Sequence, residues 1–170
     1  MRDVNDFPRG IGCTPLYFAF GYGQYEAAAV LLELKADIQN STLSGPLITH
    51  LVAGGSTLKE HTSLKLLSLM LAHGCDVHRI SHYRPFINPT VANWRMLAGS
   101  SMLFCAAHEG KVAVVQLLLS HHANPLQKCT PAGLYEGQTP LSVAIDHGHQ
   151  QIVALLEEAA FSRAQAESLP

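Results

Sequence analysis

A ten-residue pattern occurs four times along this chain, and its recurrence constrains the fold more than any other feature. Each copy begins with threonine, serine or glycine and ends with a glycine nine residues later. The copies are TPLYFAFGYG from Thr14, GPLITHLVAG from Gly45, SMLFCAAHEG from Ser101 and TPLSVAIDHG from Thr139. Recurrence of this kind indicates copies of one structural unit that stack on each other, because a single copy cannot bury its own apolar face.

A second apolar stretch follows each of these glycines. The four stretches are AAAVLLELKAD, SLKLLSLMLAHGCD, VAVVQLLLSHHAN and QQIVALLEEAA. Each is typical of an amphipathic helix that ends at a turn. In the second unit, eight extra residues around GSTLKEHT are expected between Gly54 and the second helix, whereas the fourth unit has no turn and its helix continues into EEAAFSRAQAE.

The residue types of the pattern suit a short first helix. Thr139 is expected to cap the helix, Pro140 to occupy its first turn, where no amide donor is needed, and Leu141 to point into the core. Glycine at the end of the pattern, as at Gly110 and Gly148, is expected to end the helix in a left-handed conformation. Each unit is therefore predicted to be a pair of helices.

The whole pattern resembles the ankyrin repeat, a unit of about 33 residues with a β-turn and two antiparallel helices that starts T-P-L-H-x-A. The resemblance extends from residue 12 to about residue 160. It implies an all-α ankyrin-repeat solenoid of four helix-turn-helix units in a single domain, residues 1–170. We expect units at about 12–40, 43–78, 99–125 and 137–161, and a C-terminal cap or tail over 157–170.

A long insertion separates the second and third units, because Ser101 lies 56 residues after Gly45. In an ankyrin array, this segment, residues 79–98, is a finger at the edge of the stack. Aromatic residues and arginine dominate interface hot spots, which favours a binding role. The alternative is that its aromatic side chains pin the loop to the stack, and both roles stay open. The finger residues predicted to bind a partner are Tyr83, Arg84, Phe86, Trp94 and Arg95.

The resemblance also implies binding positions outside the finger. Ankyrin partners usually dock on the concave surface made by finger tips and first helices, just before the helix-ending glycine. A second, shorter insertion lengthens the next loop. The predicted partner-binding residues here are Tyr22, His108 and Glu109, Tyr135 and Glu136 at the loop tip, and Asp146 and His147.

The function expected from the resemblance is a non-catalytic scaffold that binds a protein or peptide through the concave groove and the long finger. It implies no cofactor and no enzyme activity. Two alternatives stay open: a substrate-recognition adaptor in a larger assembly, such as a ubiquitin ligase or a bacterial effector, and, less favoured, a zinc-binding or enzymatic protein on the same scaffold.

Several histidines and cysteines are candidates for metal ligands or catalytic residues. HGCDVHRISH from His73 and HHANPLQKC from His121 contain good zinc ligands, but their spacing matches no standard zinc framework. Asp146, His147 and His149 flank a structural glycine without any catalytic signature. We therefore expect no metal site and no catalytic residue, and interpret histidines at helix ends as a source of pH-sensitive binding.

Composition argues against two classes of binding partner. The formal net charge is -2 and 14% of the residues are charged, with no block of lysine or arginine, so neither nucleic acid nor a membrane is an expected partner. The first ten residues lack the apolar core of a secretory signal, and the four cysteines lack the density of a disulfide scaffold. A cytoplasmic protein with reduced thiols is expected.

The first unit carries an unusual number of aromatic residues. They are Tyr17, Phe18, Phe20, Tyr22 and Tyr25. A terminal unit of a solenoid needs a polar outer face, so this face is expected to be covered by residues 1–11, by a partner or by additional repeats.

Overall fold

The computed structural model describes residues 14–21, 24–38, 60–80, 98–131 and 133–168. These residues form seven helices and no strand, apart from an isolated antiparallel bridge between Ile80 and Ser101. The helices are α1 (Pro15–Gly21), α2 (Tyr25–Glu33), α4 (Glu60–Ala72), α5 (Met102–His108), α6 (Val112–Ser120), α7 (Pro140–Asp146) and α8 (Gln150–Ser168).

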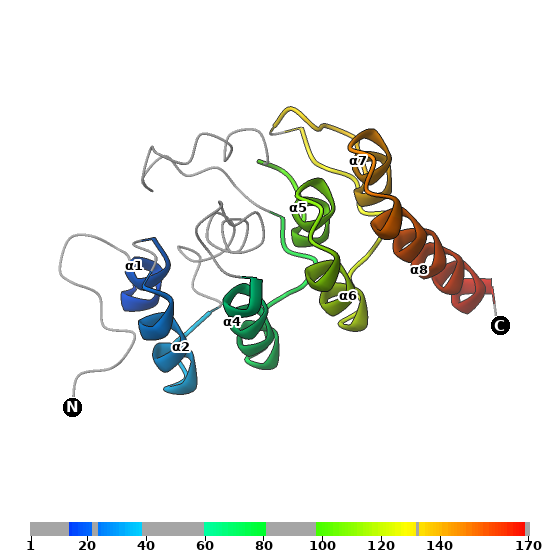
Figure 1. Cartoon of the computed structure of the whole chain (residues 1–170). Coiled ribbons are helices and arrows are strands. Elements are labelled where there is room, and N and C mark those ends of the chain that lie inside the picture. Colours follow the sequence, from blue (N-terminus) through cyan, green and yellow to red (C-terminus); the bar gives the residue numbers. More distant parts are fainter. Residues whose placement is uncertain (1–13, 22–23, 39–59, 81–97, 132, 169–170) are drawn as a thin grey trace.

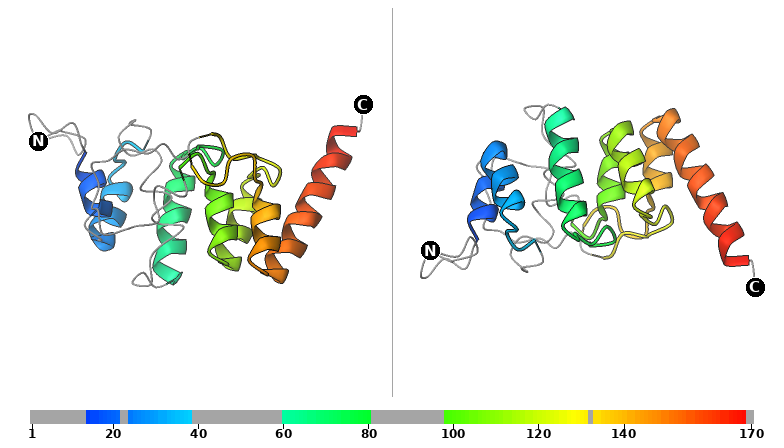
Figure 2. Two further views of the ribbon diagram at one scale, coloured as in Figure 1. Left: turned by 90° about the horizontal axis from the view of Figure 1, so that it is seen from above. Right: turned by 90° about the horizontal axis from the view of Figure 1, so that it is seen from below.

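The helices form a row of antiparallel pairs in two layers (Figure 1). Three complete pairs are present in the described residues: α1 with α2, α5 with α6, and α7 with α8. In one layer α2, α4, α6 and α8 pack side by side in chain order, and in the other α5 packs on α7. Figure 2 shows the same order from above and below, with α1 and α8 at opposite ends of the row. The predicted all-α solenoid is confirmed.

Side-chain caps begin the first helices of the third and fourth units. The Ser101 hydroxyl accepts a hydrogen bond of 3.2 Å from the Phe104 amide. Thr139 and Ser142 form a reciprocal capping box: Thr139 Oγ1 accepts from the Ser142 amide at 3.1 Å, and Ser142 Oγ accepts from the Thr139 amide at 2.9 Å. These bonds satisfy amides that lack an intrahelical partner. The predicted cap at Thr139 is confirmed.

Both described glycines at the ends of these helices are left-handed, with φ of +72° at Gly110 and at Gly148. The Gly110 amide donates to the Ala107 carbonyl at 3.3 Å, and the next amide, that of Lys111, donates to Ala106 at 3.0 Å. This pair of bonds closes the helix end in the Schellman arrangement. The predicted role of the glycines is confirmed at both positions.

The second helices of the first three units end in the same way, although only one of them has glycine at the left-handed position. The φ angles are 62° at Lys35, 83° at Gly74 and 63° at His122. A small buried residue follows each of them. These residues are Ala36, Cys75 and Ala123, with exposed fractions of 5%, 8% and 4%. The turn therefore places a small side chain between neighbouring units.

The second unit differs from prediction at the start of α4. The sequence placed eight extra residues before this helix, but Glu60, His61 and Thr62 belong to it, so α4 has 13 residues where α2 and α6 have 9. Neither proline nor glycine interrupts the chain between Glu60 and Ala72, so part of the insertion extends the helix. The first helix expected from Gly45 lies outside the described residues.

One continuous apolar core runs along the stack between the two layers. Its largest fully buried side chains include Leu16, Leu32, Leu66, Phe104, Leu118 and Ile152. Beyond the core, α8 continues to Ser168, and its side chains from Phe161 to Ala166 are exposed.

Three cysteine thiols lie in or beside this core. Burial raises the pKa of Cys75 to about 11, and it also raises the pKa values of Cys105 and Cys129. Cys129 additionally shares a hydrogen bond of 3.4 Å with the Ser100 hydroxyl. Burial therefore favours the protonated form of these three thiols over the reactive thiolate.

Candidate functional site

Five aromatic side chains lie in a continuous row across the third and fourth units. The rings follow one another with centroid separations of 5.3 Å from Phe104 to Tyr135, 5.3 Å from Tyr135 to His108, 4.5 Å from His108 to His147 and 6.0 Å from His147 to His149. We call these five residues the ring row. It combines side chains from α5, from the loop before α7 and from the turn between α7 and α8.

His108 is the central member and bonds to neighbours on both sides of its ring. Its Nδ1 lies 3.0 Å from Glu109 Oε1, and its Nε2 lies 2.9 Å from the Tyr135 hydroxyl. The Glu109 carboxylate can only accept, so Nδ1 carries the proton and donates. In the neutral ring Nε2 therefore accepts from the tyrosine hydroxyl. These two bonds fix the orientation of the ring.

The other two histidines are also held by hydrogen bonds. His147 Nδ1 donates to the Val143 carbonyl, one turn earlier in α7, at 3.0 Å. His149 Nε2 donates to the main-chain oxygen of His108 at 3.2 Å. The second bond joins the end of α5 to the turn between α7 and α8, so it connects two units.

Tyr135 reaches the row because its loop is closed by main-chain bonds. The Cys129 amide donates to the Gln138 carbonyl at 2.8 Å, and the Gly137 amide donates back to the Cys129 carbonyl at 3.0 Å. Gly137 has a φ of +75°, a conformation that glycine adopts without strain. The buried Cys129 thus anchors the base of the loop, and the loop holds Tyr135 against α5.

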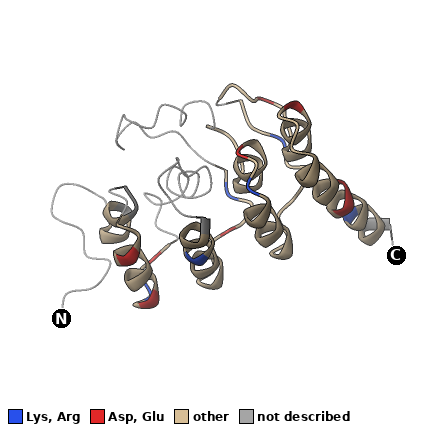
Figure 3. Cartoon of the chain, in the orientation of Figure 1, with Lys and Arg blue, Asp and Glu red and all other residues tan. Residues whose placement is uncertain are grey.

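Several charged residues are close to ring-row members in the sequence. Glu109 bonds to His108, while Glu136 and Asp146 are exposed and follow or precede row members in the chain. Lys111 and Lys128 are the nearest lysines along the same segments. Figure 3 shows charged residues sparsely scattered over the rest of the stack. Glu109 is thus a charged side chain in direct contact with the row.

The structure brings together four of the predicted binding residues, His108, Glu109, Tyr135 and His147. Glu136 and Asp146 are exposed and are neighbours of Tyr135 and His147 in the sequence. Sequence reasoning missed Phe104, which packs on Tyr135, and assigned no binding role to His149. The remaining candidates lie outside the described residues: Tyr22, Tyr83, Arg84, Phe86, Trp94 and Arg95. Their predicted roles stay predictions.

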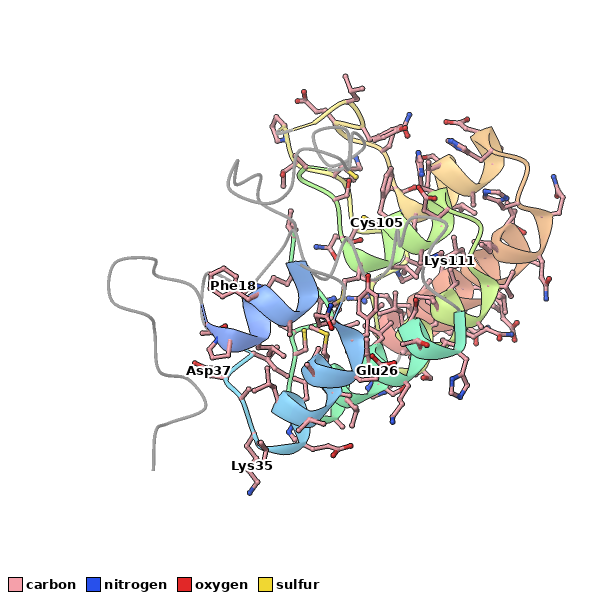
Figure 4. The ribbon with its side chains drawn as sticks, turned by 60° about the vertical axis from the view of Figure 1, so that its left-hand side comes forward. Phe18, Glu26, Lys35, Asp37, Cys105 and Lys111 are labelled. Carbon is pink, nitrogen blue, oxygen red and sulfur yellow. The ribbon has the colours of Figure 1, made fainter. Side chains whose placement is uncertain are left out.

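At the other end of the stack, the aromatic first unit is described in part. Figure 4 shows this end, with Phe18 on α1 and Glu26, Lys35 and Asp37 on and after α2. Phe18 and Tyr25 are half-buried against the core, and burial raises the pKa of the Tyr25 hydroxyl. Residues 1–11, the expected cover, lie outside the described residues.

Within the described ranges, no group of three or more histidine, cysteine, aspartate or glutamate side chains is arranged to hold a metal ion. No helix there combines the length and apolar character needed to span a membrane.

Paired helices stacked in two layers, with left-handed glycines between the helices of a pair, define a helical-repeat protein. The family described as ankyrin repeats (3 copies) matches residues 57–165, and the chain belongs to the ankyrin repeat family. Ankyrin repeats are generally protein–protein interaction modules, and the family is generally non-enzymatic.

The chain is also similar to a curated protein, the B-cell lymphoma 3 protein homolog of Mus musculus. The two are 31% identical over 163 residues, which is 94% of this chain and 29% of the relative. This chain therefore spans 29% of the length of that relative.

Proposed function

We propose that this protein is a non-catalytic scaffold that binds a protein or peptide through the ring row and the predicted finger, residues 79–98. The observation that carries the proposal is the ring row itself. It lies at the ends of α5 and α7, where the ankyrin resemblance places partner contacts.

The composition of the ring row suits an interface. Tyrosine contributes a large contact area together with a polar group, and aromatic residues are enriched among the residues that contribute most to binding. His147 is exposed, while Tyr135 and His149 are half-buried. A partner can therefore reach the row, and the buried part of the row packs against the rest of the protein. Because these side chains lie at the surface, a partner can contact them directly.

Preorganisation is the second argument. The hydrogen bonds of His108, His147 and His149 hold each imidazole in one orientation before a partner arrives. A partner then loses less affinity to the ordering of side chains.

Affinity capture from cell lysate tests the proposal with three paired variants. His147→Ala with Glu136→Ala alters exposed residues of the site, and Tyr83→Ala with Trp94→Ala alters the finger. Gln116→Ala with Gln151→Ala is the matched control, because both glutamines are exposed on second helices.

We expect a captured protein to be lost with the first pair, the second pair or both, and retained with the control. Capture of the same proteins by all three variants would refute a role for the ring row and the finger. Loss with the finger pair alone would remove the ring row from the interface.

A further inference from the structure

The second helix of the first unit exposes positions that the second helix of every later unit buries. The second helices align by the left-handed residue that follows α2, α4 and α6, and by the left-handed glycine that precedes α6 and α8. Ala27 of α2 is exposed and Leu31, one turn later, is half-buried. The equivalent residues of the later units are all buried, with no more than 3% exposed. They are Leu66 and Met70 in α4, Val114 and Leu118 in α6, and Ile152 and Leu156 in α8.

This comparison shows which neighbour these positions contact. α4, α6 and α8 each pack on the second helix before them, whereas α2 is the first of the row. Ala28 and Leu32 are fully buried in α2, which packs on α1 and α4. Glu157, the residue of α8 equivalent to Leu32, is exposed, because no described helix follows α8. Ala27 and Leu31 therefore belong to the side that later units use to contact the preceding unit.

Two further apolar side chains widen this side of α2. Val30 is 53% exposed and Leu34 is 59% exposed. Residues three and four apart are neighbours on a helix, so Ala27, Val30, Leu31 and Leu34 form one continuous surface. We call these four residues the α2 face. An apolar stripe with this spacing is typical of a helix that packs on another helix.

Acidic side chains lie along one edge of the α2 face. Glu26 and Glu33 are exposed and lie four residues before and three residues after Val30 (Figure 3). This spacing places both carboxylates next to Val30 on the helix surface. Lys35 and Asp37, which are also exposed, follow the helix with opposite charges. The edge of the face at Val30 is therefore negative.

These charges argue against a second copy of the chain as the occupant. A symmetric antiparallel pair of α2 helices would place Glu26 and Glu33 of one copy beside those of the other, and like charges at such distances repel. A second copy stacked end to end would bring its exposed Glu157 onto the apolar α2 face. A carboxylate buried there would lose its hydration without a partner. Stable dimers also bury about 20 to 30 residues a side, and the α2 face has far fewer.

We propose that the α2 face binds a short amphipathic helix of a partner protein, with lysine or arginine along one edge of its apolar stripe. The partner helix would take the place that a preceding second helix has in the later units, and it would bury Val30 and Leu34. Its basic side chains would pair with Glu26 and Glu33. This site lies on the first unit, whereas the ring row lies on the third and fourth, so the inference is separate from the proposed function.

A library of designed helical peptides tests the inference. Each peptide has apolar residues at i, i+3, i+4 and i+7, and the positions beside this stripe vary among lysine, glutamate and glutamine. Selection against the intact chain should enrich lysine over glutamate along one edge. An enriched peptide with a fluorescent label is then measured by anisotropy.

Paired substitutions in the apolar stripe localise the binding. Val30→Ser with Leu34→Ser should weaken the enriched peptide about tenfold, because two buried contacts are lost. Leu126→Ser with Leu134→Ser is the matched control, since these leucines are 51% and 73% exposed elsewhere on the protein. The control should leave binding within about twofold.

Charge reversal tests the acidic edge. Glu26→Lys with Glu33→Lys should weaken the lysine-edged peptide about tenfold and make a glutamate-edged peptide the tighter ligand. A purely structural effect of these changes would not reverse the preference. Glu157→Lys with Glu158→Lys, at exposed positions of α8, is the matched control and should keep the preference for lysine.

The inference is overturned if no peptide is enriched, if binding is unchanged by the Val30 and Leu34 changes, or if charge reversal leaves the preference for lysine intact. Loss of peptide binding with His147→Ala and Glu136→Ala instead would overturn it and support the ring row. A sedimentation mass of two chains, reduced to one by Val30→Ser with Leu34→Ser, would also overturn it by assigning the α2 face to a second copy.

Discussion

His149 Nε2 donates a hydrogen bond of 3.2 Å to the main-chain oxygen of His108, and in doing so the His149 ring lies directly over Gly110. A Cβ atom added to Gly110 would lie 2.8 Å from His149 Cε1. Gly110 is the helix-ending glycine of the third unit, and His149 directly follows Gly148, the helix-ending glycine of the fourth unit. This contact therefore connects the equivalent turns of two successive units.

This contact predicts an unequal response of two similar glycines to alanine. Gly110→Ala should lower the free energy of unfolding by about 2 kcal/mol or more, because it combines a left-handed non-glycine residue with a clash. Gly148→Ala is the matched control: Gly148 has the same φ of +72° but nothing within 4 Å of the added Cβ, so a loss of about 1 kcal/mol is expected. Urea denaturation measures both. Equal losses would exclude a steric role for His149.

Removal of the His149 side chain should have a smaller effect by itself. His149→Ala removes the bond to His108, which should cost about 1 kcal/mol of unfolding free energy. Combined with Gly110→Ala, it also removes the clash, so the double variant should be more stable than the sum of the two single losses predicts. Strict additivity in the double-mutant cycle would contradict the contact.

A stabilising substitution is predicted at the end of the second helix of the first unit. Lys35 and His122 are left-handed non-glycine residues, at positions equivalent to Gly74. Lys35→Gly should therefore raise the free energy of unfolding by about 0.5 kcal/mol, because relief of backbone strain exceeds the entropy that glycine adds to the unfolded chain. Gly74→Ala should lower it by about 1 kcal/mol. Thermal melts with the same sign for both changes would contradict this assignment.

Helix capping gives a prediction at the fourth unit. Thr139→Ala removes the acceptor for the Ser142 amide and should cost about 1 kcal/mol of unfolding free energy. Thr139→Ser keeps the hydroxyl and is the control, with a change expected below about 0.5 kcal/mol. Chemical denaturation monitored by circular dichroism distinguishes the two. A similar loss for both variants would mean that the Thr139 methyl group, and not its hydroxyl, stabilises α7.

Alkaline pH should destabilise the protein through its buried thiols. The Cys75 pKa rises from an ordinary value of 9.0 to about 11 in the folded chain, chiefly because burial disfavours the thiolate. Between these values the unfolded chain releases this proton while the folded chain keeps it, so the unfolded chain binds fewer protons and stability falls as pH rises. Denaturation at several pH values from 8 upward should show a shallower fall for Cys75→Ala than for wild type. Parallel curves would exclude Cys75 as a source of the dependence.

Much of the fold could be predicted from the sequence because local rules and the repeat agree. Thr139 caps its helix, and Gly110 and Gly148 take the left-handed conformation that only glycine adopts easily. The left-handed Lys35 and His122 could not be predicted, since no local preference favours them. Burial of Ala36 and Ala123 between units determines these positions, and that is a tertiary effect.

The candidate site could be predicted only as separate pieces. The helix-end positions of His108 and His147 follow from the repeat, but contact between their rings depends on how α5 packs on α7. Tyr135 was expected near a loop tip, whereas its bond to His108 depends on the closure of that loop at Cys129. The ring row thus depends on the stacking of the units and on the geometry of the loop. Neither can be predicted from the spacing of residues in the sequence.

Since α5 and α7 belong to successive units, the ring row exists only while those units stay in register. A molecule bound across the row would contact both units, and its binding free energy would stabilise the interface between them. In a solenoid, where each unit contacts only its neighbours, that reinforcement would be local. Binding would therefore slow the hydrogen exchange of backbone amides in α5 to α8, while the exchange rates in α1 and α2 would stay unchanged.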